Sequence, residues 1–254
     1  MRKPTRTLLI DGDILIYHEA AAVEEVFDWG DDWWTLHGDA SEAKERVDVW
    51  LEEVASLLEA EKTIVTLTGR MNWRKDVLPT YKANRKGKRK PVVYTELRRY
   101  VTATYKTACY DTLEADDVMG ILATHPVEGD NRSNETIIVS ADKDMRTVPG
   151  KLYNPNRPDE GIQKISEEEA NRNHLIQALS GDSVDGYSGC PRIGPKTADK
   201  ILTSNDWSLV VAAYEKAGLT EDDALVQARV ARILRYNEFN PKAQEVKLWD
   251  PKCL

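Results

Sequence analysis

The segment Thr7-Leu8-Leu9-Ile10-Asp11-Gly12-Asp13 places acidic side chains directly after a short apolar run. Such a run, closed by Asp and Gly, predicts a buried strand. Residues 14 to about 26 then predict a helix. The same order of strand and acid returns where Thr136-Ile137-Ile138-Val139 is followed by Asp142. Strands that alternate with helices predict an α/β fold with a mainly parallel central sheet flanked by helices.

The rest of the chain extends this pattern. Further strands are expected at 63–67 and 107–110, and further helices at 41–61, 91–105, 113–124, 166–180, 195–203, 206–217 and 221–236. Asp39 with Glu42, Ser166 with Glu169 and Thr220 with Asp223 have the spacing of helix starts. The pattern becomes mostly helical after about residue 160, so we expect an α/β core over 1–160 and a helical region over 161–254.

Composition limits the class of protein. The 254 residues are 41% apolar and 31% charged, which allows one large α/β domain or two small ones. No apolar run approaches about 18 residues, so we expect no membrane span. Three widely spaced cysteines, Cys109, Cys190 and Cys253, fit neither a disulfide framework nor a zinc cluster. Isolated thiols are typical of a reducing cytoplasm, where we expect the protein to act.

Charge is unevenly distributed along the chain. The net charge of −8 argues against general binding of nucleic acid, but residues 70–106 hold twelve basic side chains and only two acids. That segment carries +10 and the remainder −18, which predicts a basic element on an acidic body. Its Lys and Arg side chains would attract phosphates, and Tyr81 or Trp73 would stack on an unpaired base. One solvated helix face would explain the charge equally well.

Acidic residues follow three of the predicted strands. In open α/β sheets, ligands bind outside the carboxyl ends of the strands, so these acids should converge on one crevice. Carboxylates at close range repel one another unless cations are present, and Mg²⁺ is the usual partner of oxygen ligands beside phosphates. Any one cluster could instead cap a helix or complement its dipole. The acids are Asp11, Asp13, Glu114, Asp116, Asp117, Asp142 and Asp144.

The second half contains Gly181-Asp182-Ser183-Val184-Asp185-Gly186, followed by Ile193-Gly194-Pro195-Lys196-Thr197-Ala198. The latter string predicts a hairpin that enters a helix. Gly permits close backbone approach, Pro suits the first helical turn, and Lys and Thr add donors, so the helix start would hold a phosphate. An ordinary helix–turn–helix packing corner is the alternative.

Taken in order, these strings resemble the 5′-nuclease superfamily, which includes flap endonucleases and the exonuclease domain of bacterial DNA polymerase I. The matching strings are Leu9-Ile10-Asp11-Gly12, Arg74 with Leu78-Pro79-x-Tyr81-Lys82-x-x-Arg85, Leu113-Glu114-Ala115-Asp116-Asp117, Ser140-Ala141-Asp142-Lys143-Asp144, Gly181-Asp182-x-x-Asp185 and Ile193-Gly194-Pro195-Lys196-Thr197-Ala198. They span about residues 8–203. The resemblance implies a PIN-like 5′-nuclease core with a basic helical arch at about 70–106 and a C-terminal region that contains a helical hairpin.

The resemblance also implies a metal-dependent phosphodiesterase and the roles of its residues. Two Mg²⁺ ions, which Mn²⁺ would replace, would be held by Asp11, Glu114, Asp116, Asp117, Asp142, Asp144, Asp182 and Asp185. Lys82 and Arg85 would contact the scissile phosphate as catalytic residues. DNA would be bound by Arg74, Tyr81, Lys86, Lys88, Arg89, Lys90, Gly194, Lys196 and Thr197, with K⁺ at the hairpin. The partners would be duplex or flapped DNA and RNA–DNA hybrids, without a membrane or an obligate protein partner.

Two positions depart from the family pattern. Gly69 stands where the family usually has an Asp at the end of the second strand, so we expect residue 69 to face the carboxylate crevice as a vacated ligand position. Arg192 stands where the hairpin commonly has Gly, which argues against the K⁺ site.

We therefore expect a phage-type 5′→3′ exonuclease with flap endonuclease and RNase H-like activity, in phage DNA replication and recombination. In a host cell it would act in the cytoplasm. A PIN-type ribonuclease is one alternative, although such enzymes lack the segment from Asp182 to Ala198. A catalytically weakened DNA-junction binder, with Gly69 as a mark of decay, is the other.

Overall fold

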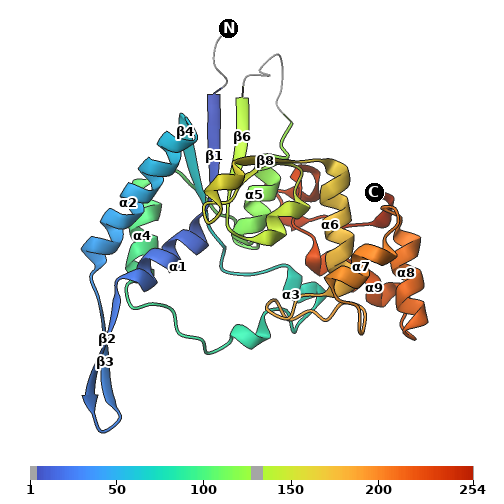
Figure 1. The fold of residues 1–254 in the computed structure, drawn as a ribbon, viewed down its shortest axis with the longest axis horizontal. Helices are drawn as coiled ribbons and strands as arrows, with labels where there is room; N and C mark the ends of the chain where they lie inside the picture. Colours follow the sequence, from blue (N-terminus) through green and yellow to red (C-terminus); the bar gives the residue numbers. More distant parts are fainter. Residues whose placement is uncertain (1–4, 127–133, 254) are drawn as a thin grey trace.

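The computed structural model describes residues 5–126 and 134–253. Its centre is a six-stranded sheet in the order β5-β4-β1-β6-β7-β8 (Figure 1). All neighbouring strands are parallel except β7 and β8. The prediction of a mainly parallel central sheet is confirmed. The strands are β1 (Thr5–Asp11), β4 (Lys62–Thr66), β5 (Thr107–Ala108), β6 (Asn134–Val139), β7 (Gly150–Tyr153) and β8 (Ile162–Ile165).

Helices cover both faces of this sheet. Leu8 and Ile10 of β1 pack in a core with α1 (Gly12–Ala22), α2 (Ala40–Leu57) and α4 (Tyr94–Thr104), whereas Leu9 belongs to the core on the opposite side. Alternation along the strand explains why both faces are apolar. The opposite core includes side chains of α5 (Ala115–Ala123) and α6 (Glu167–Ser180).

The last part of the chain is helical, as predicted. Helices α7 (Pro195–Ile201), α8 (Trp207–Lys216) and α9 (Glu221–Ala231) share a core with α6. The predicted helix starts are confirmed, because Asp39, Ser166 and Thr220 each accept a backbone N–H of the following turn. The remaining elements are α3 (Arg74–Val77), β9 (Phe239–Asn240), β10 (Glu245–Val246) and 3₁₀ turns at 83–85, 143–147, 158–160, 236–238 and 251–253.

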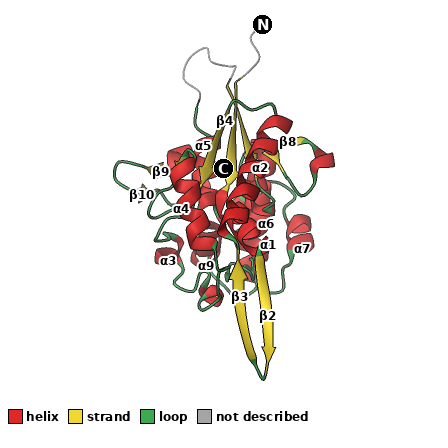
Figure 2. Ribbon diagram, turned by 90° about the vertical axis from the view of Figure 1, so that its left-hand side faces the viewer, coloured by secondary structure: helices red, strands yellow, loops and turns green. Residues whose placement is uncertain are grey.

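Some boundaries differ from the prediction. The sheet continues to Ile165, past the expected limit at residue 160, because the pair β7–β8 adds its last two strands. The helix expected over 14–26 ends at Ala22 and is followed by a hairpin of β2 (Glu24–Gly30) and β3 (Trp33–Gly38). This hairpin projects beyond the body of the molecule in both orthogonal views (Figures 1 and 2).

The basic segment also differs from the expected helical arch. Residues 78–93 form a loop with one 3₁₀ turn, and this loop runs along the end of the molecule that carries the carboxyl ends of the strands (Figure 1). Helix α4, which was expected to complete the arch, is instead part of the core. Tyr94, Leu97 and Val101 are buried against α1 and α2.

Among the described residues, no helix is both long enough and apolar enough to cross a membrane. Cys109 is exposed and Cys190 is buried, and both thiols are free.

Candidate active site

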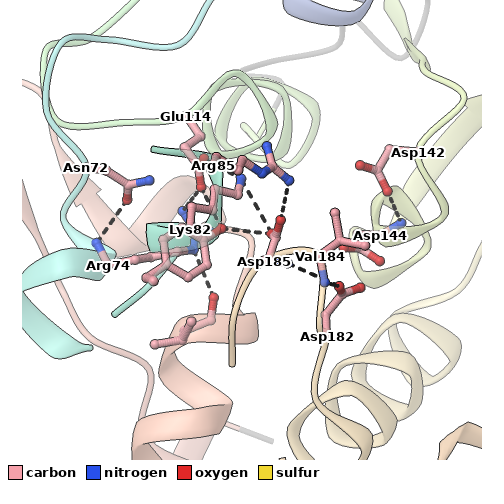
Figure 3. Close-up of polar contacts among 12 residues, drawn as sticks. Asn72, Arg74, Lys82, Arg85, Glu114, Asp142, Asp144, Asp182, Val184 and Asp185 are labelled. Atoms are coloured by element: carbon pink, nitrogen blue, oxygen red, sulfur yellow. Dashed lines mark hydrogen bonds and ion pairs between the residues drawn. The ribbon is translucent and has the colours of Figure 1, made fainter. Parts of the chain in front are cut away.

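The carboxylates gather where the parallel strands end. Asp11 closes β1, Asp142 and Asp144 follow β6, and Glu114 and Asp116 stand at the start of α5. Asp182 and Asp185, in the loop after α6, lie on the same side as Glu114, Asp142 and Asp144 (Figure 3). Parallel strands deliver their carboxyl ends to one edge, so residues far apart in sequence meet there.

Asp11, Asp116, Asp142 and Asp144 form the most acidic part of this group, at the place where the sequence predicts the crevice. Burial, together with the neighbouring Asp13 and Asp142, raises the pKa of Asp11 to about 6. Burial and the charge of Asp142 raise the pKa of Asp144 to about 7, and burial with Asp11 and Asp142 raises that of Asp116 well above its usual range. The pKa values rise because each ionised group is desolvated beside others of the same charge. A bound cation would relieve this repulsion.

Glu114 lies in a very different environment. Lys82 Nζ is 2.5 Å from Glu114 Oε1, and Arg74 Nη1 is 3.1 Å from Glu114 Oε2. Burial opposes ionisation of Glu114, but the charges of Arg74 and Lys82 outweigh it and lower the pKa to about 2. Glu114 is therefore a firmly ionised acid that holds Lys82 at the edge of the crevice.

The loop that carries Asp182 and Asp185 contacts the base of the basic segment. Arg85 Nη2 is 2.6 Å from Asp185 Oδ1, and Lys82 Nζ is 3.4 Å from Asp185 Oδ2. The Lys82 N–H donates to the Asp185 carbonyl at 2.7 Å. Asp182 pairs with Lys143 at 3.1 Å and accepts the backbone N–H of Val184. The predicted catalytic pair, Lys82 and Arg85, thus lies directly at the acids.

Two glycines make this loop possible. Gly181 and Gly189 both have positive φ, 66° and 63°, and a Cβ on either would approach the backbone of the other within 2.5 Å. Only residues without a side chain fit two such closely opposed chains. The contact closes the loop and presents its acids to the crevice.

Among the described residues, no three acidic, His or Cys side chains are already arranged to hold a metal ion. Lys82, Arg85 and Lys143 neutralise three of the acids, Glu114, Asp185 and Asp182. The donors nonetheless suit a hard divalent cation, since all are carboxylate oxygens and the Asp11–Asp116–Asp142–Asp144 cluster is poorly compensated. The residues present therefore fit a divalent metal.

Asp117 does not lie with the acids of the crevice. It is fully buried, and its two oxygens accept from Arg74 Nη1 and Nη2 at 2.7 and 2.8 Å, from Trp73 Nε1 at 3.0 Å and from the Leu234 N–H at 3.1 Å. Its expected role as a metal ligand is contradicted, because these bonds occupy both oxygens. The i, i+3 spacing from Glu114 serves the start of the helix, where Asp117 accepts the Glu114 N–H.

Arg74 and Tyr81, which were expected to bind DNA, are buried as well. Arg74 is 3% exposed and also donates to the carbonyls of Val230 and Arg232, so it ties α9 to the core. Tyr81 is 3% exposed, and its hydroxyl lies 2.9 Å from both Glu114 Oε2 and Asp185 Oδ2. Trp73 is buried too, so neither aromatic ring is free to stack on a base.

The other predicted DNA-binding residues lie on the surface. Lys86, Lys88, Arg89 and Lys90 are all exposed along the basic loop, although Arg89 forms a bidentate ion pair with Glu24. Gly194, Lys196 and Thr197 are exposed together at the start of α7. Arg192 has a φ of 64°, in the left-handed region that glycine favours.

Gly69 does not face the crevice. Its N–H donates to the Leu113 carbonyl at 2.8 Å, and a Cβ at this position would lie 2.1 Å from the Tyr110 carbonyl oxygen. The expectation of a vacated ligand position is wrong, because close approach of two backbones requires glycine here.

Several neighbours of the acids were not predicted. The Ser140 hydroxyl donates to Asp11 at 2.8 Å, the Gln177 amide donates to Asp144 at 2.7 Å, and the Asn84 amide donates to the carbonyls of Ser183 and Val184. Ser140 and Asn84 lie within the motif strings and were detectable there, whereas Gln177 lies within a helix whose sequence carries no such signal.

The sequence and the fold were also compared with those of known proteins. Residues 6–171 match the family model of the 5′-3′ exonuclease, N-terminal resolvase-like domain. The chain is 31% identical to the exonuclease of Escherichia phage T7 and 30% identical to the exodeoxyribonuclease of Enterobacteria phage T3, and each alignment covers 96% of this chain and 93% of the relative. The solved structure of the T5 5′-exonuclease with bound divalent metal ions (zinc) has a TM-score of 0.64, with 15% identity over 89% of both chains. This likeness confirms the fold.

Proposed function

The chain belongs to the 5′-3′ exonuclease family of hydrolytic nucleases, and from this premise we propose that it is a divalent-metal-dependent 5′→3′ exonuclease of duplex DNA. The cluster of Asp11, Asp116, Asp142 and Asp144 is the observation that carries the metal dependence, because burial and neighbouring negative charge raise the pKa of Asp11, Asp116 and Asp144 at the carboxyl ends of the strands. We further propose flap endonuclease and RNase H-like activity at the same site, in the cytoplasm of a phage-infected cell.

The same four acids would hold the metal, which we take to be Mg²⁺ with Mn²⁺ as a substitute. Two ions are expected, with Glu114, Asp182 and Asp185 contributing at the side of the basic loop. When bound, such ions lower the pKa of an attacking water and stabilise charge on the attacking and leaving oxygens. Ser140 and Gln177 orient two of the ligand acids by donating to Asp11 and Asp144.

Lys82 and Arg85 would act on the scissile phosphate. Both side chains are now paired with Glu114 and Asp185, so a phosphate that enters beside these acids meets cations already in place. Tyr81 fixes the two acids relative to each other by contacting both with its hydroxyl. These positions support a catalytic rather than a merely attractive role for Lys82 and Arg85.

The exposed lysines of the basic loop, Lys86, Lys88 and Lys90, would attract the DNA backbone. Gly194, Lys196 and Thr197 would hold a duplex phosphate further from the cut, at the start of α7. K⁺ binding at this hairpin is supported by the glycine-like backbone of Arg192. A PIN-type ribonuclease is less well supported, because the segment from Asp182 to Ala198 contributes both acids and this phosphate seat.

Cleavage of a 5′-end-labelled duplex, with and without Mg²⁺, tests the proposal. Wild-type protein should release labelled nucleotide only with the metal. Asp116→Asn should lower the rate by at least about a thousandfold while binding DNA normally in Ca²⁺, because it removes a ligand charge from the crevice. Asp76→Asn removes the same charge from the exposed face of α3 and should cleave normally.

Near-normal cleavage by Asp116→Asn in Mg²⁺, or equal cleavage in EDTA, would exclude this metal site. Parallel assays with a 5′ flap and with the RNA strand of a hybrid test the two additional activities. Binding of junction DNA without cleavage of any substrate would instead identify a non-catalytic binder.

A further inference from the structure

The β2–β3 hairpin exposes a group of large aromatic side chains. Trp29 is 70% exposed, Trp33 74%, Trp34 59% and Phe27 45%. Soluble proteins rarely leave such side chains together in solvent without a binding role. In the part of the chain that the structure describes, β2 and β3 form a sheet with each other alone, so these rings do not serve the core of the molecule.

Three of the four exposed rings lie on the same face of the hairpin. Phe27 pairs with Thr35, and Trp29 Nε1 donates to Thr35 Oγ1 at 3.0 Å, so Phe27, Trp29 and Trp33 share one face. Asp28 pairs with Trp34 on the other face. The tip carries Asp31 and Asp32, both with positive φ as the tight turn demands. Phe27, Trp29 and Trp33 thus form an aromatic group on one face, with Glu25 and His37 nearer the base, while Asp28 and Trp34 share the other face and Asp31 and Asp32 lie at the tip.

The base of the hairpin is joined to the basic loop. Arg89 forms two hydrogen bonds with Glu24, at 2.6 and 2.7 Å, and the Val92 N–H donates to the same carboxylate at 2.7 Å. The hairpin projects from the end of the molecule where the strands end, and the basic loop runs along the same end (Figure 1). The loop that carries exposed Lys86, Lys88 and Lys90 therefore meets the base of the hairpin that carries the aromatic rings.

Because a basic track beside exposed aromatic rings is the combination that binds single strands, we propose that Phe27, Trp29 and Trp33 stack on unpaired bases of single-stranded DNA. The sugar–phosphate backbone follows the lysines, and the acidic tip repels phosphates, so only bases approach the hairpin. This proposal rests on the proposed function, since it supplies a site for the unpaired part of a nuclease substrate.

The test compares wild-type protein with the double variant Trp29→Thr, Trp33→Thr. Threonine keeps the preference for a strand while removing the rings. Affinities are measured in Ca²⁺, for a duplex with a single-stranded extension and for a blunt duplex. We expect the variant to bind the extended duplex about 5- to 100-fold more weakly, and the blunt duplex with nearly unchanged affinity.

Leu57→Thr is the matched control, because Leu57 is an exposed apolar residue at the far end of α2, and it should bind both substrates normally. Thermal melting checks that all variants fold. As a second test, Asp31→Asn with Asp32→Asn should bind the extended duplex more tightly and with a steeper dependence on salt.

Unchanged affinity for the extended duplex in the tryptophan variant would overturn the proposal, as would equal losses on both substrates. A change from dimer to monomer in sedimentation, with DNA affinity intact, would assign the aromatic face to self-association and also overturn it. Cleavage of the blunt duplex in Mg²⁺ is measured separately, as the test of the proposed nuclease function. If wild-type protein fails to cleave but the stacking loss is seen, the proposed function fails and the hairpin site stands.

Discussion

At the scale of single residues, contacts decide whether an acid or a glycine serves chemistry or structure. Asp116 and Asp117 are adjacent in sequence, yet the charge of Asp116 lies beside Asp11 and Asp142 while Asp117 is saturated by Arg74 and Trp73. Gly69 is similar, because its position at a strand end suggests a ligand, whereas its backbone packs directly on Tyr110.

We expect Gly69→Ala to lower the free energy of unfolding by about 3 kcal/mol, because the added carbon would overlap the Tyr110 carbonyl and force two backbones apart. Gly69→Asp should be at least as damaging and should not improve Mg²⁺ binding. Urea unfolding measures both effects. Gly194→Ala, with open space around its Cβ, is the control and should cost much less. A Gly69→Asp protein with normal stability and tighter Mg²⁺ binding would contradict this view.

At the scale of elements, the start of α5 is held in place by buried charge. Arg74 on α3 is fixed by Asp117 and Glu114 of α5, and by carbonyls at the end of α9. Removing one partner of a buried pair leaves the other charge desolvated and unpaired, which is far more costly than losing a surface ion pair. This network sets the position of Glu114, and through it that of Lys82.

Asp117→Asn should therefore destabilise the protein by about 3–5 kcal/mol, through the uncompensated charge of Arg74. Asp116→Asn changes the neighbouring residue in the same way but relieves repulsion, so its stability should equal or exceed that of the wild type. Urea unfolding of metal-free protein compares the two. Similar stability of Asp117→Asn and wild type would mean that the ion pair does not anchor α5.

At the scale of the whole molecule, His174 makes the stability of the fold depend on pH. It is fully buried on α6, contacts the Ala228 carbonyl of α9 through Nε2 at 2.8 Å and packs edge-on against Trp249. Burial, with the charges of Arg232 and Arg235, lowers its pKa from 6.5 to about 3. The folded protein therefore excludes a proton that the unfolded chain binds below about pH 6.5.

Because the folded pKa is depressed, the stabilisation linked to His174 is complete above pH 6.5 and is lost as pH falls toward 3. Through His174, we expect the free energy of unfolding to fall by up to about 1.4 kcal/mol per pH unit between pH 6 and 4. His174→Gln keeps a donor for Ala228 but does not titrate, so the difference in unfolding free energy between wild type and variant should depend on pH by this amount. A constant difference across this range would show that His174 does not control acid stability.

Local patterns in the chain were sufficient to predict much of this protein. The strands at β1, β4 and β6, the helix starts at Asp39, Ser166 and Thr220, and the convergence of strand-end acids follow from periodicity, capping chemistry and the rule for parallel sheets. These features depend on neighbours within a few residues, or on a topology that the alternation of elements already implies.

Long-range contacts, by contrast, decide that Asp116 and Asp117 have different environments and that Arg74 and Tyr81 are buried. They also decide that residue 69 must be glycine. The contact that fixes each of these lies about 40 to 160 residues away along the chain: Arg74 with Val230, Tyr81 with Asp185, and Gly69 with Tyr110. The β2–β3 hairpin was not predicted because its acidic, aromatic sequence lacks a clean alternation of apolar and polar residues, although Gly30 and Asp31 mark its turn. Desolvation and backbone proximity are properties of the folded chain, and no spacing within the sequence encodes them directly.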